Sequence, residues 1–358
     1  SGQWTIGHNN DGSKSFGADI SGAIYSASVN VSASGSWELP RIPRQANITN
    51  SPSSFNDESN PWFSFSNPAN ASLKCWLEPN PNGDHLCERT LSGTSGTYTW
   101  SLTEAERNQL RAKCSGNSCT VRIGLYSTIG GTTYASYHDR TMTIVNGNPT
   151  FTDFEYKDTN TSVVAVTGND QILVKGLSTL QAIISSTNKM IANKQATAKN
   201  YVSTIDTANV STNYSKDNLN INLGIINVIG TQRLNIRAYD SRNNSTLVYK
   251  DIIIYNYDKP VINASVTRLN NFENQTTLKV EGTYSKLTIS NTDKNIVKTL
   301  QYRYRETNGT WTTWKTLTST IKDGKFTCND VILSLDNTKS YEFEVQAIDN
   351  LQTTTLPL

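Results

Sequence analysis

Side chains that commonly perform acid–base, nucleophilic or metal chemistry are few in this sequence, and they do not gather in a recognisable motif. The three histidines are His8, His85 and His138, and none forms a helical zinc-binding pair. P-loop, dinucleotide-binding and G-x-S-x-G patterns do not occur. Glu104 and Glu106 lie close together, but they open a predicted helix, where the helix dipole favours acidic side chains. The sequence therefore predicts a protein that is not an enzyme and that needs no cofactor.

Cysteines are the second candidate for chemistry, and four of the five lie in the first half of the chain. Their spacing lacks the C-x-x-C knuckles of structural zinc sites, so we expect no metal site. In an oxidising environment, four cysteines would form disulfides in one of three connectivities. We favour local pairing, because Cys75 and Cys87 flank a hairpin-like stretch while Cys114 and Cys119 bracket a tight loop. Buried free thiols are the alternative in a reducing cytosol, and the lone Cys328 is expected in a core.

Aromatic residues near the C-terminus form the best candidate binding surface. The stretch QYRYRETNGTWTTW reads as two strands joined by an Asn-Gly turn. Tyr302 and Tyr304 share one face, whereas Trp311 and Trp314, three residues apart, would point to opposite faces of a regular strand. One Trp is therefore expected in the core, and the other could stack on a sugar ring or pack on a partner. Core and interdomain packing of all four aromatics is the alternative that the sequence leaves open.

The elements that would position these residues are predominantly β. Charged residues make up only 17% of the chain, and Asn, Thr and Ser take their place, which suits pleated surfaces and turns. The net charge of +2 gives no electrostatic footprint for nucleic acid or an anionic membrane. No run of about 20 apolar residues exists, so we expect no membrane insertion.

An internal repeat predicts the number of domains. An Ala-x-Asp sequence ends a strand-like run at Asp240 and again at Asp349, 109 residues later (349 − 240). A weaker third copy is expected at Tyr126 and Ser127. Two of the β-rich runs that follow end at a proline, Pro149 or Pro260, which suits a linker because proline cannot donate to a strand ladder. A period of this length matches a seven-stranded sandwich of roughly 100 residues.

The predicted fold is therefore all-β, an elongated array of tandem immunoglobulin-like or fibronectin type III-like β-sandwiches. We expect sandwiches at residues 46–148, 149–259 and 260–358. Residues 1–45 are expected to form the last strands of a truncated β-rich N-terminal module and a linker. One short helix is predicted from Thr103, which forms a capping box with Glu106. Residues 161–168 are predicted as a strand, and a helical turn is considered at residues 188–201.

Several linker and turn motifs carry a resemblance to a known family. The sequences TIGHNNDGSKSF (residues 5–16) and GSWELPRIPRQANIT (residues 35–49) resemble the hinge of siphophage minor structural proteins. The sequences AYDSRNN (residues 238–244) and IIIYNYDKP (residues 252–260) resemble the closing strands of their tandem immunoglobulin-like domains. Phages of Gram-positive hosts, streptococci among them, carry such proteins in the tail tip or baseplate. The third sandwich departs from this pattern toward a fibronectin-like one.

The resemblance implies a virion component assembled in the host cytoplasm and extracellular after release. Its implied partners are other tail or baseplate proteins, further copies of itself, and a cell-wall polysaccharide of the host. We therefore expect a rod-like spacer with a role in host adhesion, since repetition on a symmetric tail adds avidity. The alternative is a bacterial surface adhesin or the non-catalytic accessory modules of a secreted glycan-active enzyme. A hydrolase itself would need two positioned acids, which the sequence does not indicate.

Overall fold

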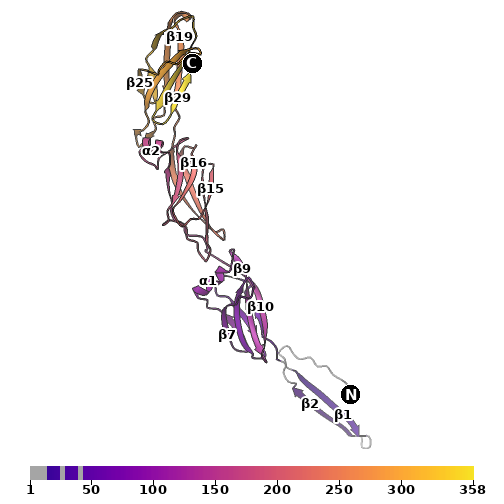
Figure 1. Cartoon of the computed structure of the whole chain (residues 1–358). Helices are drawn as coiled ribbons and strands as arrows, with labels where there is room; N and C mark the ends of the chain where they lie inside the picture. Colours follow the sequence, from indigo (N-terminus) through magenta and orange to yellow (C-terminus); the bar gives the residue numbers. More distant parts are fainter. Residues whose placement is uncertain (1–13, 25–28, 39–42) are drawn as a thin grey trace. The chain divides into compact units, whose positions relative to one another are not determined.

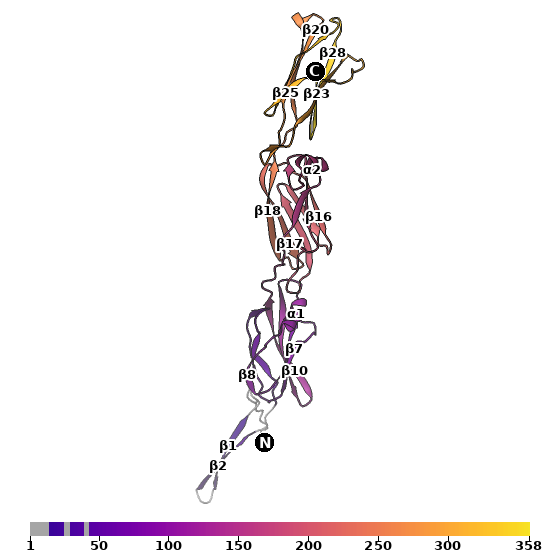
Figure 2. The same ribbon diagram turned by 90° about the vertical axis from the view of Figure 1, so that its left-hand side faces the viewer.

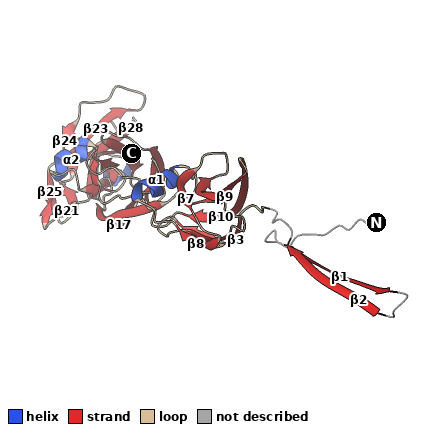
Figure 3. Cartoon of the chain, turned by 90° about the horizontal axis from the view of Figure 1, so that it is seen from below, coloured by secondary structure: helices blue, strands red, loops and turns tan. Residues whose placement is uncertain are grey.

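The computed structural model describes residues 14–24, 29–38 and 43–358, and these are almost entirely β-strands and turns (Figures 1 and 3). The expectation of an all-β chain is confirmed. The chain divides into two compact units. Unit 1 comprises Ser1–Thr150 with two short segments, Ala192–Ala198 and Asp240–Asn244. Unit 2 comprises Phe151–Ile191, Lys199–Tyr239 and Ser245–Leu358. Much of the expected N-terminal module lies outside the described residues. Its described part is the antiparallel hairpin of β1 (Ser15–Ile24) and β2 (Val29–Glu38).

Unit 1 contains a β-sandwich of a three-stranded and a five-stranded sheet. The smaller sheet has the order β3-β5-β8, and the larger has the order β4-β10-β9-β6-β7. The strands are β3 (Asn47–Asn50), β4 (Ser54–Asn56), β5 (Trp62–Ser66), β6 (Ser72–Pro79), β7 (Leu86–Leu91), β8 (Ser95–Thr99), β9 (Ser118–Ile129) and β10 (Thr132–Thr143). Phe63 and Trp100 are fully buried between the sheets, with ring centroids 5.4 Å apart. The Trp100 indole donates to the carbonyl of Cys87 at 2.9 Å, so its polar atom is satisfied in the core.

The predicted helix of unit 1 is α1 (Glu104–Ala112), and its predicted capping box is present. The Thr103 hydroxyl accepts from the backbone N–H of Glu106, while the Glu106 carboxylate accepts from the backbone N–H of Thr103. Two of the four orphan N–H groups at the helix start are thereby satisfied.

The first sandwich of unit 2 pairs a sheet of order β11-β13-β16 with one of order β12-β18-β17-β14-β15. Its strands are β11 (Glu155–Asp158), β12 (Leu173–Val174), β13 (Thr179–Ile184), β14 (Ala198–Ile205), β15 (Ala208–Asn213), β16 (Leu219–Ile225), β17 (Gly230–Asp240) and β18 (Ser245–Tyr255).

Two local predictions for this sandwich are wrong. The predicted strand at residues 161–168 is helix α2 (Thr161–Thr167), which lies at one end of the sandwich (Figure 2). Its β-branched residues suggest a strand, but Asn160 caps the first turn and Gly168 closes the last with φ +76°. The helical turn considered at residues 188–201 is absent, because loop and strand β14 occupy that stretch.

The second sandwich of unit 2 has a sheet of order β19-β20-β26-β25, in which β27 also pairs with β20, and a sheet of order β24-β23-β28-β29. Its strands are β19 (Val261–Arg268), β20 (Gln275–Thr283), β21 (Thr288–Ile289), β22 (Thr292–Asp293), β23 (Val297–Glu306), β24 (Lys315–Thr316), β25 (Ser319–Lys322), β26 (Lys325–Cys328), β27 (Val331–Ser334), β28 (Tyr341–Asp349) and β29 (Thr353–Pro357). A single turn of 3-10 helix, η1 (Leu269–Asn271), follows β19.

The repeated Asp occupies one structural position in both sandwiches of the later chain. Asp240 ends β17 and Asp349 ends β28, and each carboxylate accepts hydrogen bonds from backbone N–H groups of the following hairpin turn. The weaker third copy is misplaced, because Ser127 lies inside β9, which runs on to Ile129. The turn after β9 is Gly130-Gly131, where both residues have positive φ and no Asp is needed.

The cysteines form one of the two expected bridges. Cys114 and Cys119 are joined by a disulfide, whereas Cys75 and Cys87 are buried free thiols. Cys75 lies opposite Arg89 in the ladder, and a register shift follows it, so the expected partner does not face it. Burial raises the pKa of the Cys75 thiol to about 12 and that of Cys87 to about 11, which disfavours the reactive thiolate. Cys328 is also a buried thiol, as expected.

Candidate functional site

The four aromatic residues singled out in the sequence lie on both faces of the sheet formed by β24, β23, β28 and β29. Tyr302 points inward and is 5% exposed, so it belongs to the core and cannot serve a binding surface. Tyr304 lies on the same inward face, half-buried, with its ring stacked on Phe343 at a centroid distance of 5.5 Å. The two tyrosines share a face as predicted, but that face is the packed one.

Both tryptophans lie on the outer side of this sheet, beside the same arginine. The Arg303 guanidinium lies 4.7 Å from the Trp311 ring and 4.5 Å from the Trp314 ring, and Arg305 lies 4.5 Å from Trp311. The prediction that the tryptophans point to opposite faces, one of them into the core, is wrong. Residues 310–314 are not a regular strand, so side chains three apart need not diverge. Both indoles are partly exposed.

A ladder of cross-strand pairs holds the arginines in place. Arg303 faces Glu344 and Arg305 faces Glu342 across β23 and β28, and each Nε donates to its carboxylate at 2.6 Å. Gln301 extends the row with a 2.6 Å hydrogen bond to Gln346. We call Gln301, Arg303, Arg305, Trp311, Trp314, Glu342, Glu344 and Gln346 the Trp–Arg face.

The Trp–Arg face combines flat apolar rings with fixed polar groups. Each guanidinium is held by a carboxylate and lies beside an indole, so the contacts favour this arrangement of the rings before any ligand arrives. Amide and carboxylate atoms beside the rings offer donors and acceptors. Such a surface suits a sugar ring, whose apolar face can stack on an indole while its hydroxyls bond to the polar row. The sequence signal that could have located the arginines is the R-x-R run of β23 opposite the E-x-E run of β28.

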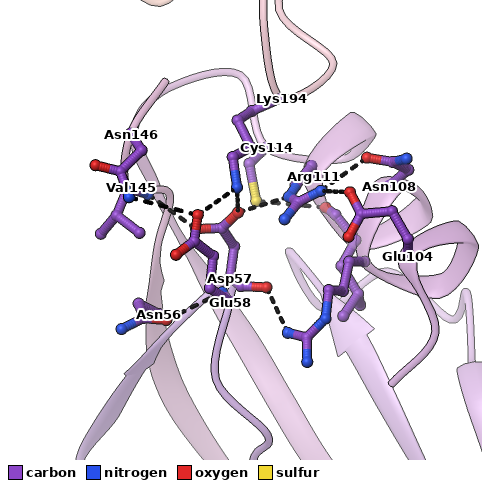
Figure 4. A network of polar contacts seen from close by, with 12 residues as sticks. Asn56, Asp57, Glu58, Glu104, Asn108, Arg111, Cys114, Val145, Asn146 and Lys194 are labelled. Carbon is purple, nitrogen blue, oxygen red and sulfur yellow. Dashed lines mark hydrogen bonds and ion pairs between the residues drawn. The ribbon is translucent and has the colours of Figure 1, made fainter. Parts of the chain in front are cut away.

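A buried cluster of charges in unit 1 is the strongest alternative for a reactive site (Figure 4). Asp57 is 3% exposed and Arg111 is 1% exposed, and Arg111 Nε donates to Asp57 Oδ2 at 2.6 Å. Lys194 Nζ lies 3.2 Å from the same oxygen and 2.7 Å from Glu58 Oε1. Arg111 also bonds to Glu104, so each charged side chain of this cluster has a partner of opposite charge. Among the described residues no group of His, Cys, Asp and Glu could hold a metal ion.

We expect acidification to remove part of the stability that Asp57 provides to unit 1. Burial by itself would raise the pKa of this carboxyl, but hydrogen bonds from the Val145 N–H, Arg111 and Lys194 outweigh burial and lower the pKa below its usual value of 3.8. A carboxyl with a lowered folded pKa contributes stability that is present above the unfolded pKa and is lost as pH falls through the folded pKa.

The measurement is the melting temperature of unit 1 between pH 7 and pH 3, for the wild-type chain and for Asp57→Asn. The wild-type melting temperature should fall more steeply below about pH 4 than that of the variant, which has no carboxyl to titrate. Identical slopes would show that Asp57 does not titrate with folding.

A second buried carboxylate stabilises the start of the last hairpin. Asp349 is 3% exposed and accepts from the Tyr257 hydroxyl at 3.0 Å and from Asn295 Nδ2 at 2.8 Å. Its other oxygen accepts from the backbone N–H groups of Leu351 and Gln352, both at 2.7 Å. Because all four donors are satisfied by one side chain, Asp349 is an architectural residue.

Comparison with known proteins places the chain in a phage family. The family described as "Siphovirus protein of unknown function (DUF859)" matches residues 1–354. The chain belongs to this siphovirus family. The resemblance drawn from the linker motifs is thereby supported at the level of a siphovirus protein. No curated protein is similar to the chain.

Several solved structures match this siphovirus protein at low sequence identity. An ICAM-5 D1–D4 ectodomain fragment matches with a TM-score of 0.43 and 10% identity, covering 99% of this chain and 88% of that chain. A tetra-tandem repeat from the extending region of a large adhesion protein matches with a TM-score of 0.35 and 12% identity, covering 97% and 81%. A bacterial ice-binding adhesin matches with a TM-score of 0.30 and 13% identity, covering 89% and 96%.

No helix among the described residues is long and apolar enough to cross a membrane.

Proposed function

We propose that this siphovirus protein is a minor structural component of the tail tip or baseplate that binds a cell-wall polysaccharide of the host. The tandem sandwiches act as a spacer, and the Trp–Arg face contacts the glycan. The observation that carries the adhesive role is the pair of partly exposed indoles held over Arg303. Membership of a siphovirus family supports a role in the particle.

The spacer role is supported by the packing inside unit 2. A hydrophobic cluster joins its two sandwiches, with Val163 and Val174 from the first and Leu287 and Ile289 from the second around Tyr257. Tyr257 stands in the linker and also donates to Asp349. These contacts support a spacer role, because a packed and hydrogen-bonded linker bends less freely than an exposed one.

We propose further that the protein has no catalytic activity of its own. Glu342 and Glu344, the acids of the Trp–Arg face, are each bonded to an arginine. The general acid of a glycosidase must be free to reach the leaving-group oxygen, whereas each of these carboxylates is already engaged by a guanidinium. This arrangement supports binding without hydrolysis.

The proposal is tested by incubating the labelled chain with host and non-host cells. We expect strain-specific decoration that soluble wall polysaccharide of the host competes away, without release of reducing sugar. No decoration of any cell would contradict the adhesive role, and release of reducing sugar would contradict the non-catalytic one.

We expect Trp311→Ala and Trp314→Ala together to weaken binding to host cells by at least about tenfold, which corresponds to about 1.4 kcal/mol. The change removes both stacking rings and leaves the ion pairs of Arg303 and Arg305 in place. Tyr249→Ala is the matched control, because Tyr249 is a half-exposed ring that stacks on Arg233 at 3.9 Å in the other sandwich of unit 2. Circular dichroism checks that each variant is folded. Unchanged binding by the folded double variant would exclude the Trp–Arg face.

A further inference from the structure

Two side chains on the outward face of the five-stranded sheet in unit 1 are buried, although side chains on an outer face are usually exposed to solvent. Leu73, Cys75 and Leu77 of β6 point into the core, so Trp76 and Glu78 point outward. Yet Trp76 is 2% exposed and Glu78 is 4% exposed. Neighbouring residues cover both side chains: the rings of Tyr126 and His85 stack on the indole, and the backbone at Asn82 and Gly83 donates to the carboxylate.

The strand register explains how Trp76 is accommodated. Trp76 of β6, Gly124 of β9 and Tyr137 of β10 lie in one row across the sheet. A Cβ at Gly124 would lie 2.2 Å from the indole, so only glycine leaves room for the ring to lie across β9. The Trp76 ring stacks on Tyr126 at 4.0 Å and on His85 at 4.4 Å. Because Trp76 is almost fully buried, it supports the partly exposed rings of Tyr126 and His85, and these two rings form an aromatic floor.

The adjacent row places polar groups beside this floor. Glu78, Arg122 and Asp139 lie in register across the same three strands. Arg122 is held by Asp139 through bonds of 2.7 and 3.0 Å and lies 3.9 Å from the Tyr137 ring centroid. Glu78 Oε1 accepts from the backbone N–H groups of Asn82 and Gly83.

Two polar atoms of this site could each make a further hydrogen bond. Glu78 Oε2 lies 3.9 Å from Arg122 Nη1, which is beyond hydrogen-bonding distance. The indole nitrogen of Trp76 is buried and makes no hydrogen bond within the part of the chain that the structure describes. A buried donor without an acceptor is unfavourable, so a ligand that accepts from it would relieve that cost.

A cavity of about 330 Å³ lies here, and its lining includes Trp76, Glu78, His85, Arg122 and Tyr126. Tyr137, which is 52% exposed, also lines it. Ligand sites usually have volumes of roughly 300–1,000 Å³, so this cavity is a small one. It has room for a single ring but not for the whole length of a long ligand.

We propose that this cavity, the Trp76 pocket, binds one neutral pyranose unit of a glycan. A sugar hydroxyl can both accept from the Trp76 indole and donate to Glu78 Oε2, while the aromatic floor suits the apolar face of the ring. An anionic sugar is disfavoured for two reasons. Arg122 is already paired with Asp139, and the acidic side chain of Glu78 offers an anion no attraction. A quaternary ammonium group is disfavoured, because it has no acceptor for the indole N–H. The proposal does not depend on the Trp–Arg face, which lies in unit 2.

The test is a titration of the full chain with neutral hexoses and N-acetylhexosamines, followed by NMR of the indole N–H signals. The Trp76 signal is assigned by its disappearance in Trp76→Phe, which keeps an aromatic ring and removes the donor. We expect one sugar of the panel to shift that signal saturably, with a dissociation constant on the order of 1 mM, or about 4 kcal/mol.

Two variants localise the binding. Glu78→Gln and Tyr137→Ala should each weaken it at least about fivefold, or about 1 kcal/mol, and the exposed position of Tyr137 keeps the second variant folded. The Trp311→Ala, Trp314→Ala double variant should bind the sugar with unchanged affinity, which separates this proposal from the adhesive role of unit 2.

The pocket proposal is overturned if no sugar shifts the Trp76 signal up to about 100 mM, if choline or a sialic acid shifts it instead, or if the double variant alone abolishes binding.

Discussion

Replacing Asp57 with alanine should lower the free energy of unfolding of unit 1 by about 3–5 kcal/mol. The substitution leaves the guanidinium of Arg111, which is 1% exposed, without its buried carboxylate partner. It also removes the acceptor of the Val145 N–H and one of the two carboxylates that hold Lys194. Glu104 remains bonded to Arg111 but is largely exposed, so it cannot compensate for the lost buried partner.

Hydrogen exchange read by mass spectrometry measures this effect in unit 1 alone, through peptides that cover β5 and β9. The exchange protection of those peptides should fall by about two to four orders of magnitude, which corresponds to about 3–5 kcal/mol. Asp84→Ala is the matched control, because Asp84 is a half-exposed aspartate paired with Lys113 in the same unit, and it should leave the protection of those peptides nearly unchanged. Equal protection in Asp57→Ala and wild type would show that the buried charge cluster does not stabilise the sandwich.

Replacing Asp349 with alanine should destabilise the last sandwich of unit 2 by about 3–4 kcal/mol, because buried donors lose their acceptor. One carboxylate satisfies the Tyr257 hydroxyl, the Asn295 amide and two backbone N–H groups of the hairpin turn. Each buried donor left unsatisfied costs about 1–3 kcal/mol, and water can reach only those at the turn. The hydroxyl of Tyr257 also loses the contact that ties the linker to the hairpin.

Thermal unfolding and chymotrypsin digestion test both consequences of Asp349→Ala. The melting temperature of unit 2 should fall by several degrees, and cleavage next to Tyr257 should accelerate as the linker loosens. The control is Asp330→Ala, because Asp330 is a half-exposed aspartate of the same sandwich that lies 3.6 Å from Lys279. If Asp349→Ala behaves like Asp330→Ala, the repeated Asp has no architectural role.

Features determined by neighbours in the sequence could be predicted without the structure. The Thr103 and Glu106 capping box, and the turn opened by each repeated Asp, depend on hydrogen bonds that span only a few residues. The alternation of Tyr341, Phe343 and Val345 likewise indicates which face of β28 is buried. The capping residues of helix α2 are also neighbours in the sequence, yet the helix was not predicted. Its Val-rich sequence, taken without its caps, suits a strand.

Features determined by register between distant strands could not be predicted. A shift after Cys75 separates it from Cys87, and no pattern within one strand reports that shift. The Trp76 pocket depends on glycine at position 124 lying opposite Trp76, a coincidence of two strands almost 50 residues apart (124 − 76). Trp311 and Trp314 share one arginine because their segment is irregular, whereas the periodicity argument assumes a regular strand.

Depletion of the purified chain from solution by isolated host cell walls tests whether the Trp–Arg face binds wall polysaccharide. We expect intact walls to remove the wild-type chain and Tyr249→Ala equally. Walls stripped of their polysaccharide should remove neither, and intact walls should leave the folded Trp311→Ala, Trp314→Ala double variant in solution. Equal depletion of the double variant and the wild-type chain by intact walls, or undiminished depletion by stripped walls, would contradict this expectation.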